Sequence, residues 1–533
     1  MTSVANFADL LARAAQTSPD RVALVESASG RRVTWRELDS EVDRVAHGLS
    51  GLGLVAGHRV MFALPNRIEL VTAYLATLRA RLVAVPVNPG SATGETVRMI
   101  ADSGARAVVA DLSTVTTVRA AVAGLEDALA GADEELRART VVPRIVVASA
   151  PALPGETPWS DLAGAEGREV PPSMDAEALA VLLYTSGTSG RPRAAMLSHR
   201  ALLANVEQAG AVANPPVTSA DTVLGVLPLF HVYGLNAVLG QVVGHAARLV
   251  LLERFDPDET LHVIEDEAVT VVPVAPPALT HWRDVEDLAE RLRGVRLVLS
   301  GSAPLPPEVA EAFEERAGVP VHQGYGLTEA APVVTSTLGS GTPKRGSVGC
   351  ALPGIELRLV DDAGHRPEGS DPGEIEVRGD NLFSGYWPDG EDGPGEDGWW
   401  ATGDVGFLDE DGDLFLVDRL KELVIVSGFN VYPVEVEDVI GELDVVVEAA
   451  VIGVPDDQTG EAVVAYVVPV PSTSLSPVEV EGRVRSHCAE RLARFKQPSV
   501  VEVVDELPHT VTGKVAKGRL RATERRRYLG LLE

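Results

Sequence analysis

The chain has few cysteines, no excess of basic charge and no long apolar run, and each absence excludes a class of protein. Its two cysteines, Cys350 and Cys488, lie far apart, so neither a disulfide framework nor a cysteine-based metal site is expected. Lys and Arg number 46 against 77 Asp and Glu, which gives a formal net charge of −31. This acidity argues against a general nucleic-acid surface and against docking on anionic membranes through basic residues.

Membrane and targeting signals are also missing. No window approaches the roughly 18 uninterrupted apolar residues of a membrane-spanning helix. Residues 1–20 contain no basic segment followed by an apolar block, so no signal peptide is expected. We therefore expect a soluble, cytoplasmic protein without nucleic-acid partners, large enough at 533 residues for roughly two to four domains or subdomains.

What the chain does contain is a polar, glycine-bearing stretch directly after an apolar run. Residues 179–183 are apolar and predict a buried strand of a parallel sheet. Residues 184–193 then read YTSGTSGRPR, and helical spacing follows His199. The order strand, polar loop, basic residues, helix favours a phosphate-binding loop, although its spacing is not that of a Gly-x4-Gly-Lys-Ser/Thr P-loop. A solvated Ser/Gly turn is the alternative.

The rest of the chain alternates strand and helix patterns and then changes texture. Predicted strands lie at 22–25, 60–64, 82–87, 107–110, 222–227, 248–252, 269–274 and 295–299. Predicted helices lie at 10–15, 35–49, 68–79, 257–268 and 305–318. This alternation indicates parallel sheets covered by helices. Short strands separated by Gly, Pro and Asp turns predict a β-rich part at 346–417, and a smaller α+β unit follows residue 419.

Further polar stretches suit a nucleotide site, although each has a plainer reading. Residues 324–329, GYGLTE, could place a tyrosine ring beside a base and Glu329 on Mg²⁺, or could be a Gly-rich turn. Asp404, after a glycine, could accept ribose hydroxyls or serve a turn. Lys514, in TVTGK, could hold a carboxylate and a phosphate or be one surface lysine of a basic tail. His231 lies in an apolar neighbourhood, where a histidine usually belongs to the core.

In their order and spacing these stretches closely resemble the motifs of the adenylate-forming enzymes, which include acyl-CoA synthetases, luciferases and peptide-synthetase adenylation domains. The resemblance spans nearly the whole chain, and residues 427–433 are closest to fatty acyl-CoA synthetases. It implies an α/β fold with a large N-terminal AMP-binding domain, residues 1–417, made of two parallel-sheet α/β subdomains and a β-rich distorted barrel. A hinge at 418–421 would then lead to a small mobile α+β domain at 422–533.

The resemblance also implies the site residues and the cofactors ATP, Mg²⁺ and coenzyme A. The expected catalytic residues are Thr185, His231, Glu329 and Lys514, with Thr185 and Glu329 as metal ligands. The expected ATP-binding residues are Thr185, Ser186, Gly187, Thr188, Ser189, Gly190, Arg193, Gly324, Tyr325, Gly326, Thr328, Asp404, Arg419 and Lys421. The expected residues for the acid and for CoA are His231, Gly301, Ser302, Ala303, Ser427, Gly428, Phe429 and Asn430.

In this family Lys514 would be the adenylation lysine and Lys421 the hinge. One departure stands out, because the family's usual Pro-Lys-Gly is replaced by Pro192-Arg193-Ala194. Arginine is planar and bulkier than lysine, and alanine has less backbone freedom than glycine, so we expect a working loop with altered kinetics.

The expected function is an ATP-dependent ligase that converts a carboxylic acid to acyl-AMP and then to an acyl-CoA thioester. Segments 231–240 and 301–306 contain no Lys or Arg for a second carboxylate, so a medium- or long-chain fatty acid is preferred over a dicarboxylate. The alternatives are an aromatic acid, a thiol on a separate carrier protein, an oxygen-dependent luciferase and a weakly active nucleotide- or acyl-binding regulator.

Overall fold

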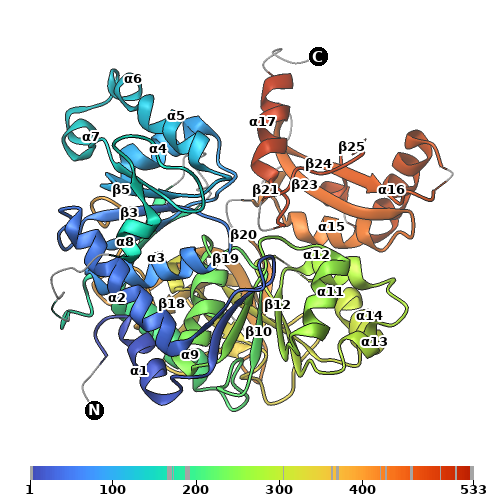
Figure 1. The fold of residues 1–533 in the computed structure, drawn as a ribbon. Helices are drawn as coiled ribbons and strands as arrows, with labels where there is room; N and C mark the ends of the chain where they lie inside the picture. Colours follow the sequence, from blue (N-terminus) through green and yellow to red (C-terminus); the bar gives the residue numbers. More distant parts are fainter. Residues whose placement is uncertain are drawn as a thin grey trace. The chain divides into compact units, whose positions relative to one another are not determined.

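The chain divides into two compact units (Figure 1). The computed structural model describes residues 4–164, 171, 173–185, 193–303, 305–361, 364–367, 371–419, 422–426, 429–456, 460–473, 475–492, 494–510 and 513–528. The first unit holds the described residues up to 356 and those of 378–400, and the second holds those of 357–377 and from 401 onwards. The predicted boundary at 418–421 stays a prediction, and Lys421 itself lies outside the described residues.

The first unit contains a seven-stranded sheet in the order β7-β6-β5-β3-β4-β8-β9. Its strands are β3 (Arg59–Ala63), β4 (Val83–Pro86), β5 (Ala107–Ala110), β6 (Arg144–Val147), β7 (Thr157–Pro158), β8 (Leu179–Thr185) and β9 (Arg193–Ser198). Neighbours pair in parallel except β8 and β9, which are antiparallel. In β4 and β5 every residue is buried and most are valine or alanine, which explains why these two segments form inner strands.

A nine-stranded sheet in the order β16-β15-β14-β13-β12-β10-β11-β1-β2 completes the core of the first unit. Its strands are β1 (Val22–Glu26), β2 (Arg32–Thr34), β10 (Thr222–Gly225), β11 (Arg248–Leu251), β12 (Val271–Val274), β13 (Leu297–Ser300), β14 (Val321–Gly326), β15 (Val333–Ser336) and β16 (Cys350–Ala351). Neighbours from β14 through β13, β12, β10 and β11 to β1 pair in parallel, whereas β2 at one edge and β15 and β16 at the other pair antiparallel.

Helices cover both sheets, and α11 to α14 lie together beside β10 and β12, where Trp282 and Phe313 are fully buried (Figure 1). The α-helices of this unit are α1 (Asp9–Thr17), α2 (Trp35–Gly51), α3 (Ile68–Arg79), α4 (Thr93–Ser103), α5 (Val115–Ala123), α6 (Leu125–Leu129), α7 (Glu134–Arg139), α8 (Trp159–Ala163), α9 (His199–Gly210), α10 (Gln241–His245), α11 (Pro257–Asp266), α12 (Pro276–Trp282), α13 (Leu288–Arg291) and α14 (Pro307–Ala317). A π-helix spans Tyr233–Gly240 and a 3₁₀ turn spans Thr328–Ala330.

The second unit is built on two small sheets. One has the order β17-β18-β19-β20, with β17 (Glu356–Val360), β18 (Gly373–Arg378), β19 (Trp400–Leu408) and β20 (Leu414–Arg419). The other joins β21 (Val424–Val426), β22 (Phe429–Val431), β23 (Val446–Asp456), β24 (Gly460–Pro469) and β25 (Val500–Val503) with α15 (Pro433–Gly441), α16 (Pro477–Arg491) and α17 (Lys517–Tyr528). A 3₁₀ turn spans Arg494–Lys496. Ser476 and Glu479 form a capping box at the start of α16.

The expected order of strand, loop, basic residues and helix is wrong at one step. Residues 193–198 form β9, which runs antiparallel to β8, and α9 begins only at His199 with Ser198 as its N-cap. The sequence of β9 is RAAMLS, which has no β-branched residue, so its strand state comes from pairing with β8 rather than from propensity. The predicted phosphate loop therefore joins two antiparallel strands. Within the described residues, no helix is both long and apolar enough to span a bilayer.

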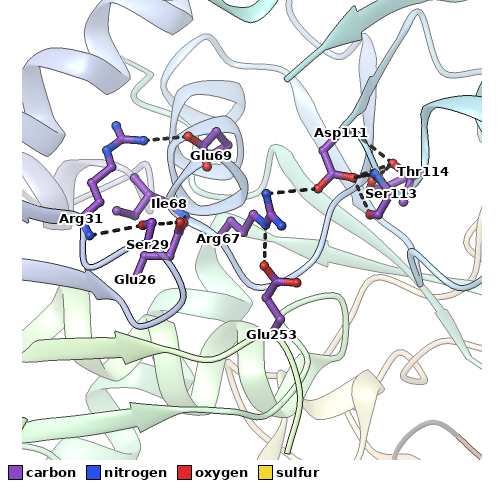
Figure 2. A network of polar contacts seen from close by, with 11 residues as sticks. Glu26, Ser29, Arg31, Arg67, Ile68, Glu69, Asp111, Ser113, Thr114 and Glu253 are labelled. Carbon is purple, nitrogen blue, oxygen red and sulfur yellow. Dashed lines mark hydrogen bonds and ion pairs between the residues drawn. The ribbon is translucent and has the colours of Figure 1, made fainter. Parts of the chain in front are cut away.

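A polar network links the carboxyl ends of β5 and β11 in the first unit (Figure 2). Arg67 Nε lies 2.7 Å from Glu253 Oε1, just after β11, and Arg67 Nη1 lies 3.8 Å from Asp111 Oδ2, just after β5. Asp111 is 2% exposed, and its Oδ1 accepts hydrogen bonds from the backbone N–H and the hydroxyl of Ser113. Arg67 thus supplies the cation for a buried carboxylate and ties the two parallel sheets together.

The start of α3 belongs to the same network. Its N-cap residue Arg67 makes no side-chain cap, but Glu26 Oε2 accepts the Ile68 N–H at 3.1 Å. Glu26 stands at the end of β1, and its Oε1 also accepts the Ser29 hydroxyl at 2.7 Å. A carboxylate from another strand therefore satisfies a helix N-terminus that its own sequence leaves uncapped.

We expect Arg67→Ala to lower the free energy of unfolding by about 1–3 kcal/mol, because the buried Asp111 side chain loses the guanidinium that it faces. Arg36→Ala is the matched control, since Arg36 and Asp20 are 63% and 85% exposed and such pairs contribute about 0–1 kcal/mol. The midpoint of the first urea-unfolding transition measures both effects. Equal shifts in the two variants would contradict the role of Arg67.

Buried His199 predicts an acid-sensitive stability. Its Nδ1 accepts the Phe7 N–H at 3.1 Å, and burial lowers the pKa of His199 to about 4, against a smaller opposing effect of Asp175. Because the folded pKa lies below the unfolded value of about 6.5, this contribution to stability is complete above pH 6.5 and is lost as the pH falls towards 4. The loss should total about 3 kcal/mol. His199→Asn, whose amide oxygen can accept the same N–H, should show less acid destabilisation in urea unfolding at pH 7.5, 5.5 and 4.5. Parallel pH profiles for both proteins would refute this assignment.

Candidate active site

The two ends of the predicted phosphate loop lie opposite each other. Thr185, the last residue of β8, pairs in register with Arg193, the first residue of β9, and the Thr185 hydroxyl donates to the Arg193 carbonyl at 3.3 Å. Residues 186–192 lie outside the described residues, so the roles of Ser186, Gly187, Thr188, Ser189 and Gly190 stay predictions. The two strands nevertheless place Thr185 opposite Arg193, the last cation of the motif.

Arg193 lies against an aromatic ring and a carboxylate. Its Cζ is 3.9 Å from the ring centroid of Tyr386, and its Nη1 is 2.7 Å from Asp392 Oδ2. The Arg193 side chain remains 38% exposed and that of Asp392 69%, so the ion pair is screened by water and holds Arg193 only weakly. The guanidinium is therefore available to exchange Asp392 for a phosphate oxygen.

Glu329 is a buried carboxylate on the 3₁₀ turn that follows β14. It is 9% exposed, and its Oε1 accepts the Tyr386 hydroxyl at 2.6 Å. Burial, together with the charge of Glu329 and the hydrogen bond to it, raises the pKa of Tyr386, so the phenol stays the donor. Over the part of the chain that the structure describes, no Lys or Arg pairs with Glu329, which leaves a buried carboxyl group suited to a cation.

The carboxylate of Glu329 suits a magnesium ion better than a metal ion whose ligands all come from the protein. Among the described residues, no group of three or more His, Cys, Asp or Glu side chains gathers into a metal centre. Mg²⁺ usually binds one or two carboxylates, with waters and substrate phosphates as its other ligands. Glu329, which has no Lys or Arg partner among the described residues, meets that requirement.

The GYG motif lies on β14, and close backbone packing accounts for its glycines. A Cβ on Gly324 would lie 2.7 Å from the Thr335 carbonyl oxygen, and one on Gly326 would lie 2.3 Å from that of Pro332. Tyr325 between them is 7% exposed, and Thr328 begins the 3₁₀ turn of Glu329. Strand pairing alone requires these glycines, so their presence says little about a ligand. The position of Glu329 is set by the 3₁₀ turn at Thr328–Ala330.

The predicted acyl-side residues meet at the carboxyl end of β13. Gly301 follows this strand, and a Cβ there would lie 3.0 Å from the ring of Tyr233, the first residue of the π-helix. The Tyr233 hydroxyl donates to the Leu299 carbonyl at 3.3 Å, and the Tyr233 N–H donates to His231 Nδ1 at 3.3 Å. Ser302 has a positive φ of 73°, uncommon for serine, and Ala303 follows it. π-helical turns often mark functional sites.

The remaining predicted residues belong to the second unit. Asp404 on β19 pairs in register with Arg419 on β20, and Asp404 is 8% exposed. Lys514 follows Gly513, whose φ is +81°, in a turn where the Lys514 N–H donates to the Thr510 hydroxyl at 3.1 Å. Phe429 and Asn430 lie on β22, opposite Val426 and Ile425 of β21. Ser427 and Gly428, like Lys421, lie outside the described residues.

Sequence reasoning missed Tyr386 and Asp392. Both lie in a loop after β18, 57 or more positions from Glu329 and about 200 from Arg193. The local sequence, residues 383–395, is rich in Gly, Pro and Asp and indicates only a turn. The contacts of Tyr386 with Glu329 and Arg193 are visible only once the chain has folded.

Comparison with known proteins gives the family. The model of the AMP-binding enzymes matches residues 11–387, and that of the AMP-binding enzyme C-terminal domain matches residues 435–514. A 4-coumarate–CoA ligase of Oryza sativa is 34% identical over 94% of this chain and 92% of its own. A long-chain-fatty-acid–CoA ligase of Bacillus subtilis is 33% identical over 96% of this chain and 93% of its own.

The fold agrees with this assignment. The ATP-bound crystal structure of MatB from Rhodopseudomonas palustris superimposes with a TM-score of 0.86 at 33% identity, over 98% of this chain and all of that chain. ATP, Mg²⁺ and coenzyme A are the cofactors of this family. Together with the matching motifs, these similarities show that the chain belongs to the AMP-binding enzymes, the adenylate-forming superfamily, as an AMP-forming acyl-CoA synthetase.

Proposed function

We propose that this enzyme activates a medium- or long-chain fatty acid to acyl-AMP and then transfers the acyl group to coenzyme A. The observation that carries the proposal is the composition around His231. Segments 231–240 and 297–303 contain no Lys or Arg, and Leu235, Val238 and Leu239 of the π-helix are fully buried. An apolar acyl chain bound beside these segments would gain about 0.8 kcal/mol per buried CH₂, and the segments themselves offer no cation to a second carboxylate.

In the first half-reaction the acid's carboxylate attacks the α-phosphate of ATP, and pyrophosphate leaves. Thr185 and Arg193 would hold the departing phosphates, and Asp404 with Arg419 would hold the ribose. Glu329 would retain Mg²⁺, whose charge offsets that of the triphosphate when bound. Lys514 would stabilise the negative charge that develops between carboxylate and phosphate.

In the second half-reaction the thiol of CoA attacks the acyl carbonyl, and AMP leaves. Residues 427–430 would line the thiol's approach after the C-terminal domain turns about Lys421, with the chain divided at 418–421 as the family motifs suggest. One site used twice in sequence requires such a rearrangement, because the groups serving adenylation must give way to those serving the thiol.

An aromatic acid is the main competing substrate, and the 4-coumarate–CoA ligase relative supports it. Transfer to the thiol of a separate carrier protein is a further alternative. A weakly active nucleotide- or acyl-binding regulator is the third alternative. Ala194 gives it little support, because this residue lies in the extended β9 with its side chain buried, where the backbone freedom of a glycine is not needed.

Acid-dependent exchange of pyrophosphate into ATP tests the substrate. Octanoate, palmitate, benzoate, 4-coumarate, malonate and acetate are compared, first alone and then with CoA to detect thioester. The proposal expects the fatty acids to have the highest kcat/KM, with only modest discrimination between neighbouring chain lengths. Preference for benzoate or 4-coumarate would replace the fatty acid with an aromatic one, and adenylation without thioester would favour the carrier protein.

Lys514→Ala should separate the two half-reactions. Losing one preorganised contact to developing charge costs about 2.7–4 kcal/mol of barrier, so exchange should fall roughly 100- to 1,000-fold. Conversion of supplied acyl-AMP to thioester should stay near the wild-type rate, which also serves as the internal control for folding. If both half-reactions fall equally, Lys514 does not have this role.

A further inference from the structure

A short loop at residues 383–392 holds one tyrosine against two groups of the candidate site. The Tyr386 hydroxyl donates to Glu329 Oε1 at 2.6 Å, whereas the Tyr386 ring face lies 3.9 Å from Arg193 Cζ. The two contacts use different parts of one side chain. Tyr386→Phe can therefore remove the hydrogen bond to Glu329 and leave the ring contact with Arg193 in place.

Main-chain contacts fix this tyrosine in place. The Tyr386 N–H donates to the Glu391 carbonyl at 3.0 Å, and its carbonyl accepts the Gly390 N–H at 2.8 Å. Gly385, with φ of +84°, has no room for a side chain, since a Cβ would lie 2.0 Å from the Gly390 carbonyl oxygen. The loop is also hydrogen-bonded to β9, where the Trp387 N–H donates to the Ala194 carbonyl at 2.9 Å.

The same environment explains arginine at position 193. A planar guanidinium can stack on a tyrosine ring and still direct N–H groups to an anion, whereas a lysine ammonium is a point charge without a planar face. Asp392 at 2.7 Å occupies one such N–H group. The ring of Phe383 packs edge-on against Tyr386, with centroids 5.1 Å apart, so the stacking surface is itself supported.

We propose that Tyr386 is a positioning residue that couples Glu329 to Arg193, so that the metal-side carboxylate and the phosphate-side cation meet one triphosphate in a set geometry. The proposal rests on the proposed function, which assigns Mg²⁺ to Glu329 and phosphate to Arg193. A tyrosine that served packing alone would leave nucleotide binding unchanged when only its hydroxyl was removed.

Binding of a non-cleavable α,β-methylene analogue of ATP, measured by calorimetry with Mg²⁺ and with EDTA, tests the coupling. Tyr386→Phe keeps the ring and should weaken binding roughly three- to tenfold with Mg²⁺ but not with EDTA, because only the contact to Glu329 is lost. Tyr386→Leu also removes the stacking surface and should weaken binding under both conditions.

Tyr74→Phe is the matched control. The Tyr74 hydroxyl is fully buried and has no hydrogen-bond partner among the described residues, so its removal should change neither measurement. If Tyr386→Phe binds the analogue like the wild type with Mg²⁺, or is weakened equally with EDTA, the coupling is overturned. Failure of the proposed function is a separate outcome, namely normal Mg²⁺-dependent analogue binding by the wild type without exchange for any acid.

Discussion

The antiparallel pairing of β8 with β9 is the constraint on which the candidate site depends. Every other described pairing in the seven-stranded sheet is parallel, so this reversal sends the chain back beside itself after the polar loop. It places Thr185 opposite Arg193, brings β9 against the 383–392 loop and starts α9 at His199. The buried strands of this sheet are rigid. Because β8 and β9 are paired, the backbones of Thr185 and Arg193 are held opposite each other.

Helices and strands with a strong local pattern of apolar residues could be predicted from the sequence. Elements that form only because another strand pairs with them could not. Apolar runs such as 107–110 and helical spacing such as 68–79 are local properties, and the structure confirms both at these bounds. β9 has little strand propensity and forms because β8 offers it a hydrogen-bonded edge, which no local window reveals. The α/β class with its β-rich part and separate C-terminal domain follows from local patterns and from motif wording together.

The candidate site divides in the same way. Glu329, Arg193 and Lys514 could be predicted from the sequence, because each lies in a stretch that resembles a known family motif. Tyr386 could not be predicted, because its partners are far away in the chain and its own surroundings resemble an ordinary turn. The fold also changes how the replacement of the family's Pro-Lys-Gly by Pro192-Arg193-Ala194 is interpreted. Ala194 is buried in an extended strand, and Arg193 has an aromatic surface that suits its planar side chain.

Gly385 has a consequence for how this enzyme could be altered. Since the loop closes through main-chain contacts at Gly385 and Gly390, the Cα of residue 386 is placed by the backbone and not by its own side chain. Position 386 is therefore a tuning point, where hydroxyl, ring and charge could be varied on an unchanged scaffold. Position 385 is the opposite, because any Cβ there would collide with the backbone that sets the scaffold. Neighbouring residues thus differ sharply in their tolerance of substitution, and a designer seeking new metal or phosphate preferences should vary position 386 and keep Gly385.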